Sequence, residues 1–145
     1  MTDFVKDAPP HVAVLLGLAF ERIRDGFDDP RWRGVRQSHL RIVESIAPEG
    51  SRAADLARRL RMTKQGTGQL VAGLLARGLV EQVPDSDDRR ARLLVLTEAG
   101  AELRRAVDEQ LTGLESGWAA EVGRDDYATF RTVLERIATV PDHRG

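Results

Sequence analysis

Cysteine is absent from the 145-residue chain, and aromatic side chains make up only 5% of it. Without cysteine there are no disulfides, thiolate metal ligands or cysteine-based redox sensors. The longest apolar run, residues 12–20, contains a glycine and is too short to cross a bilayer. The first residues also lack the basic and apolar regions of a secretory signal, so we expect a cytoplasmic protein.

The chain also lacks a catalytic or metal-binding constellation. His11, His39 and His143 are far apart in the sequence and have no metal-ligand spacing. Ser38 and His39 are neighbours, but adjacency alone does not make a nucleophile and its base. No phosphate-binding loop or cofactor motif is present. We therefore expect a protein that is not an enzyme and has no cofactor and no metal.

The charge of the chain is unevenly distributed, although its net value is only −1. Residues 52–92 contain nine lysines and arginines against five acidic residues, a local charge of +4. The flanking segments, residues 1–51 and 93–145, carry −1 and −4. A basic segment in a near-neutral chain is typical of a protein that binds nucleic acid. We expect the acidic C-terminal third to lie away from DNA or in a subunit interface.

The spacing of apolar residues predicts a single, mainly α-helical domain. We expect helices over residues 12–27, 35–47, 53–60 and 64–77, with Ser51 and Thr63 as the N-caps of the third and fourth and Gly78 as the left-handed stop of the fourth. The third and fourth helices, joined by a short turn, have the spacing of a helix-turn-helix.

A β-hairpin and two further helices complete the predicted fold. The β-prone runs 80–83 and 92–96 flank a polar loop, so they predict a hairpin that would form the wing of a winged helix-turn-helix. Thr97 is expected to cap a long helix whose near-heptad apolar stripe suits a partner helix. A last helix is expected to follow the break at Gly123 and to include Tyr127.

Candidate DNA contacts lie at the start of the fourth predicted helix, because that end of a recognition helix enters the major groove. The candidates are Thr63, Lys64, Gln65, Thr67, Gly68 and Gln69. Gln65 and Gln69 suit adenine, Lys64 suits a guanine or a phosphate, and the two threonine hydroxyls suit phosphates. The alternative is that the first half of any exposed helix is polar.

Three glycines in this helix are unusual, because each costs about 1 kcal/mol in a helix interior. For Gly73 we favour packing against a neighbouring helix. Gly66 and Gly68 are left open between packing and a close approach of the helix to DNA. Arg77, near the end of the helix, is a further candidate DNA contact.

The predicted wing contains Arg89, Arg90 and Arg92 beside three acidic residues, Asp85, Asp87 and Asp88. An arginine at a hairpin tip can enter a narrow minor groove. The alternative is a solvated turn that neutralises itself. Ser51 and Arg52 are candidates for holding a phosphate at a helix start, or they form only a helix cap.

Several stretches together resemble the MarR family of winged helix-turn-helix transcriptional regulators. They are Ala53-Ala54-Asp55-Leu56-Ala57-Arg58-Arg59-Leu60, Leu75-Ala76-Arg77-Gly78-Leu79-Val80, and Asp88-Arg89-Arg90 followed by Leu96-Thr97 and Gly100. The resemblance covers essentially the whole chain. It implies a DNA-binding lobe over about residues 36–97 and dimerisation helices over about residues 8–27 and 98–140.

The resemblance further implies a homodimer that binds a pseudo-palindromic DNA operator, usually as a repressor. Asp88 and Arg90 match the aspartate–arginine pair of the family's wing, with Arg90 entering the minor groove. A small aromatic or anionic effector would bind in a cleft, for which the candidates are Phe20, Trp32, Arg36 and His39. His39 and Trp32 are also interpreted as ordinary packing residues. The alternative function is a winged-helix protein-interaction module that does not bind DNA.

Overall fold

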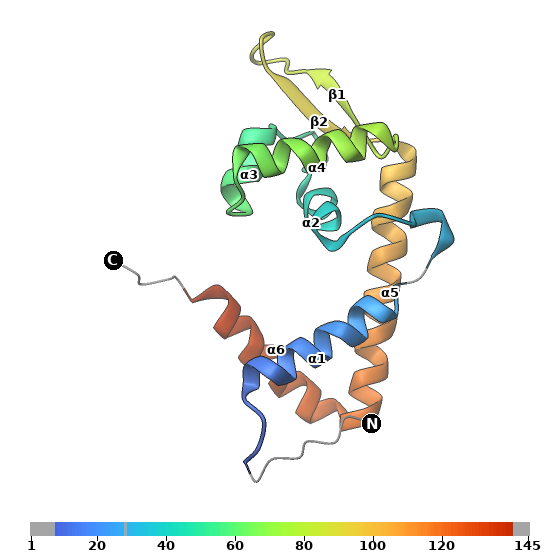
Figure 1. The fold of residues 1–145 in the computed structure, drawn as a ribbon, viewed down its shortest axis with the longest axis vertical. Helices are drawn as coiled ribbons and strands as arrows, with labels where there is room; N and C mark the ends of the chain where they lie inside the picture. The colour runs from blue at the N-terminus through green and yellow to red at the C-terminus, as the bar shows by residue number, and fades with distance from the viewer. Residues whose placement is uncertain (1–7, 28, 141–145) are drawn as a thin grey trace. The chain divides into compact units, whose positions relative to one another are not determined.

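The computed structural model describes residues 8–27 and 29–140 (Figure 1). The chain divides into two compact units, one made of residues 1–27 and 109–145 and the other of residues 28–108. The long helix α5 (Glu98–Val122) belongs partly to each unit. The predicted fold class, mainly α-helical with a small β-hairpin wing, is confirmed.

The unit of residues 28–108 begins with four helical segments. They are η1 (Pro30–Trp32), α2 (Gln37–Ser45), α3 (Ala53–Arg59) and α4 (Lys64–Ala76). Helix α2 is shorter than the predicted range 35–47, because Arg36 is its N-cap and Ile46 already has extended backbone angles. The core between these helices contains Ile42, Leu56 and Leu74, all completely buried.

Helix α4 begins and ends where its capping residues predict. The Oγ1 atom of Thr63 accepts a hydrogen bond from the backbone N–H of Gly66 at 3.0 Å, which satisfies one free donor of the first turn. Gly78 has a φ of +68°, the left-handed conformation that ends many helices and that glycine adopts without strain. Both capping predictions are therefore confirmed.

The wing consists of strands β1 (Val80–Pro84) and β2 (Arg92–Leu96), which pair antiparallel with Val80 opposite Leu96. Ser51 forms an isolated bridge to this hairpin, because its N–H and C=O each bond to Leu94, at 2.9 and 2.8 Å. The prediction that Ser51 caps α3 is therefore wrong. Its hydroxyl instead accepts from the backbone N–H of Ala47 at 3.0 Å, and Arg52 occupies the N-cap position.

Helix α5 follows the wing directly. The Oγ1 atom of Thr97 accepts from the N–H of Gly100 at 3.1 Å, which confirms Thr97 as the cap of the first turn. A Cβ at Gly100 would overlap the carbonyl of Leu79, so only glycine allows this turn to pass so close to the chain before β1. Leu103 and Val107, further along α5, are buried.

The second unit contains α1 (Val12–Asp25), the later part of α5 and α6 (Arg124–Thr139). Gly123, with a φ of +97°, separates α5 from α6. Two ion pairs lie within this unit, Arg22 with Glu121 at 3.0 Å and Arg131 with Glu115 at 2.8 Å. No helix among the described residues combines the length and the apolar character needed to cross a membrane.

Candidate nucleic-acid interface

The outward face of α4 presents four of the six residues predicted for the start of the recognition helix. Lys64, Gln65, Gly68 and Gln69 are exposed. Gln65 and Gln69 are four positions apart, so both side chains lie on one face of the helix. Lys64 forms no ion pair within residues 8–27 and 29–140. These side chains can therefore reach a ligand without first breaking an internal salt bridge.

Thr63 and Thr67 have different positions, although both were predicted as phosphate contacts. Thr63 is exposed at the N-cap, whereas Thr67 is only 1% exposed. Thr67 precedes Leu70 by three positions and Leu74 by seven, so it belongs to the apolar stripe of α4. The prediction that Thr67 contacts phosphate is therefore wrong, and the helical spacing was the signal that identifies it as a core residue.

The three glycines of α4 have three different surroundings. A Cβ at Gly73 would lie 3.1 Å from Nε2 of His39, which supports the packing interpretation for that residue. A Cβ at Gly66 would lie 2.9 Å from the capping hydroxyl of Thr63. A Cβ at Gly68 would meet nothing within 4 Å, so no contact within the chain requires glycine there.

All three predicted arginines of the wing are exposed, Arg89 and Arg90 in the turn and Arg92 at the start of β2. None of them forms an ion pair within the described part of the chain. Asp88 accepts a hydrogen bond from the backbone N–H of Arg90 at 3.0 Å. Asp88 therefore contacts Arg90 through the backbone of the turn, and within the described part of the chain no ion pair joins it to the Arg90 guanidinium.

A second aspartate of the wing pairs with a residue outside it. Asp85 is 7% exposed, and its Oδ2 accepts from Nε of Arg52 at 3.0 Å and from Nη2 at 2.6 Å. Its Oδ1 accepts from the backbone N–H of Asp87 at 3.0 Å. The bonds from Asp87 and Arg52 hold the pKa of Asp85 below its usual value. Sequence reasoning missed this pair, because the partners are 33 positions apart.

The same contacts change the interpretation of Ser51 and Arg52 as a phosphate site. The N–H of Ser51 already bonds to Leu94, and the guanidinium of Arg52 is already held by Asp85. The predicted binding of phosphate by the backbone N–H groups at this helix start is therefore not supported. The ion pair with Asp85 is the contact that holds the Arg52 side chain.

Arg77 also has a contact within the chain. Its Nη1 donates to the carbonyl of Arg33 at 2.9 Å, and its guanidinium lies against Gly34, which has a φ of +84°. A side chain at Gly34 would collide with this guanidinium. Arg77 thus links the end of α4 to the loop before α2, while its side chain remains exposed.

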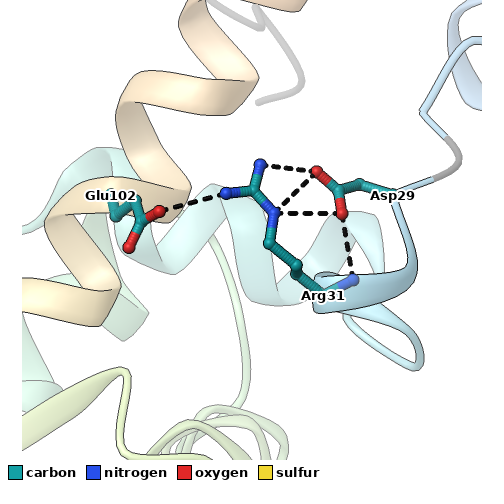
Figure 2. Close-up of polar contacts among 3 residues, drawn as sticks. All are labelled: Asp29, Arg31 and Glu102. Atoms are coloured by element: carbon teal, nitrogen blue, oxygen red, sulfur yellow. Dashed lines mark hydrogen bonds and ion pairs between the residues drawn. The ribbon is translucent and has the colours of Figure 1, made fainter.

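A cluster of three charged residues attaches η1 to α5 (Figure 2). Nη2 of Arg31 lies 2.7 Å from Oδ2 of Asp29, and its Nη1 lies 3.0 Å from Oε1 of Glu102. The hydrogen bonds from Arg31 lower the pKa of Asp29 below its usual value. The guanidinium also lies 5.3 Å from the ring of Trp32, within cation–π range.

The four candidates for an effector cleft fall in different units. Trp32, Arg36 and His39 belong to residues 28–108, and Phe20 belongs to the other unit. Nδ1 of His39 accepts from the backbone N–H of Arg36 at 3.0 Å, and burial lowers the pKa of His39 below its usual value. Trp32 is also buried. Both observations support the interpretation of His39 and Trp32 as packing residues.

Phe20 lines an apolar groove of about 620 Å³ that lies wholly within its own unit. The groove is formed by α1, α5 and α6, and its lining includes Ile23, Leu111, Trp118 and Phe130. Trp32, Arg36 and His39 are not among its lining residues.

The helix-turn-helix of α3 and α4, followed by a two-stranded wing, defines a winged helix-turn-helix protein. Residues 33–91 match the sequence model of the MarR family. The chain is 35% identical over 119 residues to the HTH-type transcriptional regulator PetP of Rhodobacter capsulatus. This alignment covers 81% of this chain and 68% of PetP. The chain belongs to the MarR family and is a DNA-binding transcriptional regulator.

Solved structures of other regulators share this fold. The PcaV transcriptional regulator of Streptomyces coelicolor superimposes with a TM-score of 0.67 at 22% identity, covering 95% of this chain and 96% of PcaV. CouR of Rhodococcus jostii superimposes with a TM-score of 0.71 at 20% identity, covering 94% of this chain and 98% of CouR. At these identities the likeness concerns the fold.

Proposed function

We propose that this regulator binds a pseudo-palindromic operator as a homodimer, with α4 in the major groove and Arg90 of the wing in the minor groove. The observation that carries the proposal is that α4 and the wing each expose polar side chains, and that none of the charged ones forms an ion pair within the described part of the chain. Lys64, Gln65 and Gln69 project from α4, and Arg89 and Arg90 project from the wing. In such a dimer the two recognition helices are spaced about 34 Å apart, one turn of DNA.

The apolar surface of the unit containing α1 and α6 supports the homodimer. All the large hydrophobic side chains that are exposed among the described residues belong to this unit; they include Val12, Leu16, Phe20, Leu111, Phe130 and Ile137. Large exposed apolar side chains gathered on one part of a chain are typical of a surface that a partner covers. A second copy of the chain would cover them, as the family membership suggests.

We further propose that the regulator is a cytoplasmic repressor that a small aromatic or anionic effector releases from DNA. PcaV was solved in complex with its natural ligand, and CouR was solved bound to p-coumaroyl-CoA. These complexes support ligand response as the mode of regulation. Of the four predicted cleft residues, Phe20 lines the apolar groove of its own unit, and this groove is the proposed ligand site. A thermal-shift screen of small aromatic acids would identify a stabilising ligand.

The wing's role is tested with Arg90→Ala in operator titrations over a range of salt concentrations. Removing one positively charged side chain that contacts a phosphate or a groove should weaken operator binding. It should also reduce the slope of log K against log salt concentration by about one unit. Arg105→Ala is the matched control, because Arg105 is an exposed arginine of α5, outside α4 and the wing. An unchanged affinity and slope in Arg90→Ala would contradict the proposed wing contact.

The recognition helix is tested separately with Gln65→Ala. Loss of a bidentate base contact should relax sequence preference at one position by about 1–3 kcal/mol, whereas non-specific binding should change little. Intact discrimination between operators would place base readout elsewhere. If the wild-type chain binds no DNA upstream of its own gene even at low salt, the operator proposal fails, and a protein-interaction module becomes the better account.

A further inference from the structure

One buried carboxylate connects the wing to the start of the helix-turn-helix. Asp85 directly follows β1, and its N–H donates to the carbonyl of Ala91 at 3.1 Å, across the base of the turn. Its Oδ1 accepts from the N–H of Asp87, and its Oδ2 accepts from both Nε and Nη2 of Arg52, the N-cap residue of α3. A single side chain thus bonds to the interior of the turn and to the start of a helix.

We infer that Asp85 is a positioning residue for the DNA-binding wing: held by Arg52, it fixes the turn of residues 85–91 so that Arg89 and Arg90 keep a set place relative to α4. This inference rests on the proposed operator binding. Asp85 itself is too buried to contact DNA, so its effect must pass through the residues it orders. Ordering a loop before binding reduces the entropy lost when the complex forms.

The sign of the charge makes this inference testable. An aspartate near the DNA repels phosphates, so its neutralisation should strengthen binding if charge alone matters. A positioning role predicts the opposite result for Asp85. Asparagine at position 85 keeps an oxygen that can accept from the N–H of Asp87, but it loses the charge that holds the guanidinium of Arg52.

The experiment compares Asp85→Asn with Asp87→Asn in operator titrations. Asp87 is the matched control, because it lies in the same turn, is exposed, and makes no side-chain hydrogen bond or ion pair with the residues that the structure describes. We expect Asp87→Asn to bind operator as tightly as the wild type or more tightly. We expect Asp85→Asn to bind about 10-fold more weakly, because a charge-assisted contact is lost. Equal strengthening in both variants would overturn the inference.

A double-variant measurement separates positioning from general damage to the lobe. In a chain that already carries Arg89→Ala and Arg90→Ala, the wing has lost the side chains that Asp85 is inferred to place. Asp85→Asn should then reduce operator affinity less than about 2-fold, because interacting sites are not additive. If Asp85→Asn costs the same factor in both backgrounds, it acts elsewhere and the inference is wrong.

Amide hydrogen exchange gives a readout that does not depend on DNA. In Asp85→Asn, exchange at Asp87 and Ala91 should become faster, whereas amides of α2 and α5 should keep their wild-type rates. Unchanged exchange in the turn would overturn the inference even if the operator is bound. A wild-type chain that binds no operator would instead refute the proposed function, so the two failures are distinguishable.

Discussion

Replacing Gly68 by alanine should change the stability of the fold and its affinity for DNA in opposite directions. Gly68 lies inside α4, is exposed, and has no neighbour within 4 Å of the position that a Cβ would occupy. Glycine in a helix interior costs roughly 0.5–1 kcal/mol relative to alanine. Gly68→Ala should therefore raise the free energy of unfolding by about that amount, with a rise in Tm of about 1–4 °C.

The effect on DNA follows from the place of Gly68 between Gln65 and Gln69 on the outward face of α4. If that face enters the major groove, an added methyl group must displace either the helix or a base contact. Overpacking of a close-fitting surface costs about 1–3 kcal/mol, so we expect operator affinity to fall about 10-fold. Thermal melting and a fluorescence-anisotropy titration on the same preparations measure both quantities.

Gly73→Ala in the same helix provides the contrast. A Cβ there would lie 3.1 Å from Nε2 of His39, and this ring cannot shift freely because it is buried and its Nδ1 accepts from the N–H of Arg36. We therefore expect this variant to lose stability, whereas its folded fraction should bind operator like the wild type. Two results would refute the reasoning about Gly68. A stabilised Gly68→Ala variant with unchanged operator affinity would show that this face does not approach DNA closely, and a destabilised one would show that the helix needs glycine at this position.

Two further predictions concern the core around α4. Burial and the charges of Arg36 and Arg77 lower the folded-state pKa of His39 below 6.5, so its contribution to stability is present above pH 6.5 and is lost as pH falls through the lower folded-state pKa. Denaturant unfolding of the wild type and of His39→Asn between pH 7.5 and 5.5 measures this effect. In the variant, the free energy of unfolding should fall less steeply with falling pH, by up to about 1.4 kcal/mol per pH unit. An equal pH dependence of the free energy of unfolding in both proteins would contradict the prediction. Thr67→Val should raise the free energy of unfolding by about 1 kcal/mol, because Oγ1 of Thr67 is buried without a partner among the described residues. The operator affinity of Thr67→Val should stay unchanged. A clear loss of operator affinity would show that Thr67 contacts DNA after all.

Local patterns predicted most of the fold. The N-cap at Thr63, the left-handed Gly78 and the cap at Thr97 depend on residues within a few positions of one another, and all three are as predicted. The hairpin could also be predicted, because two β-prone runs joined by a short polar loop pair most simply as antiparallel neighbours. The family resemblance added the expectation that the first and last helices form a dimer interface.

The errors arose where the structure depends on distant partners or where residue type was weighed above periodicity. Ser51 looked like a helix cap, but its backbone pairs with Leu94, far along the chain. The bond between Arg52 and Asp85 has no local signature either. Thr67 is a different case: its spacing from Leu70 showed that it lies on the buried stripe, although threonine is a common phosphate ligand.

The contacts of the wing's acidic residues explain how arginines can stay available in a loop that also carries aspartates. Asp85 is compensated by Arg52, which lies outside the loop, and Asp88 bonds to the backbone N–H of Arg90. Neither carboxylate is paired with the guanidinium of Arg89 or Arg90. These aspartates therefore give the turn its shape without neutralising its arginines. The wing can meet a phosphate or a minor groove without breaking an internal ion pair, which lowers the energetic cost of binding.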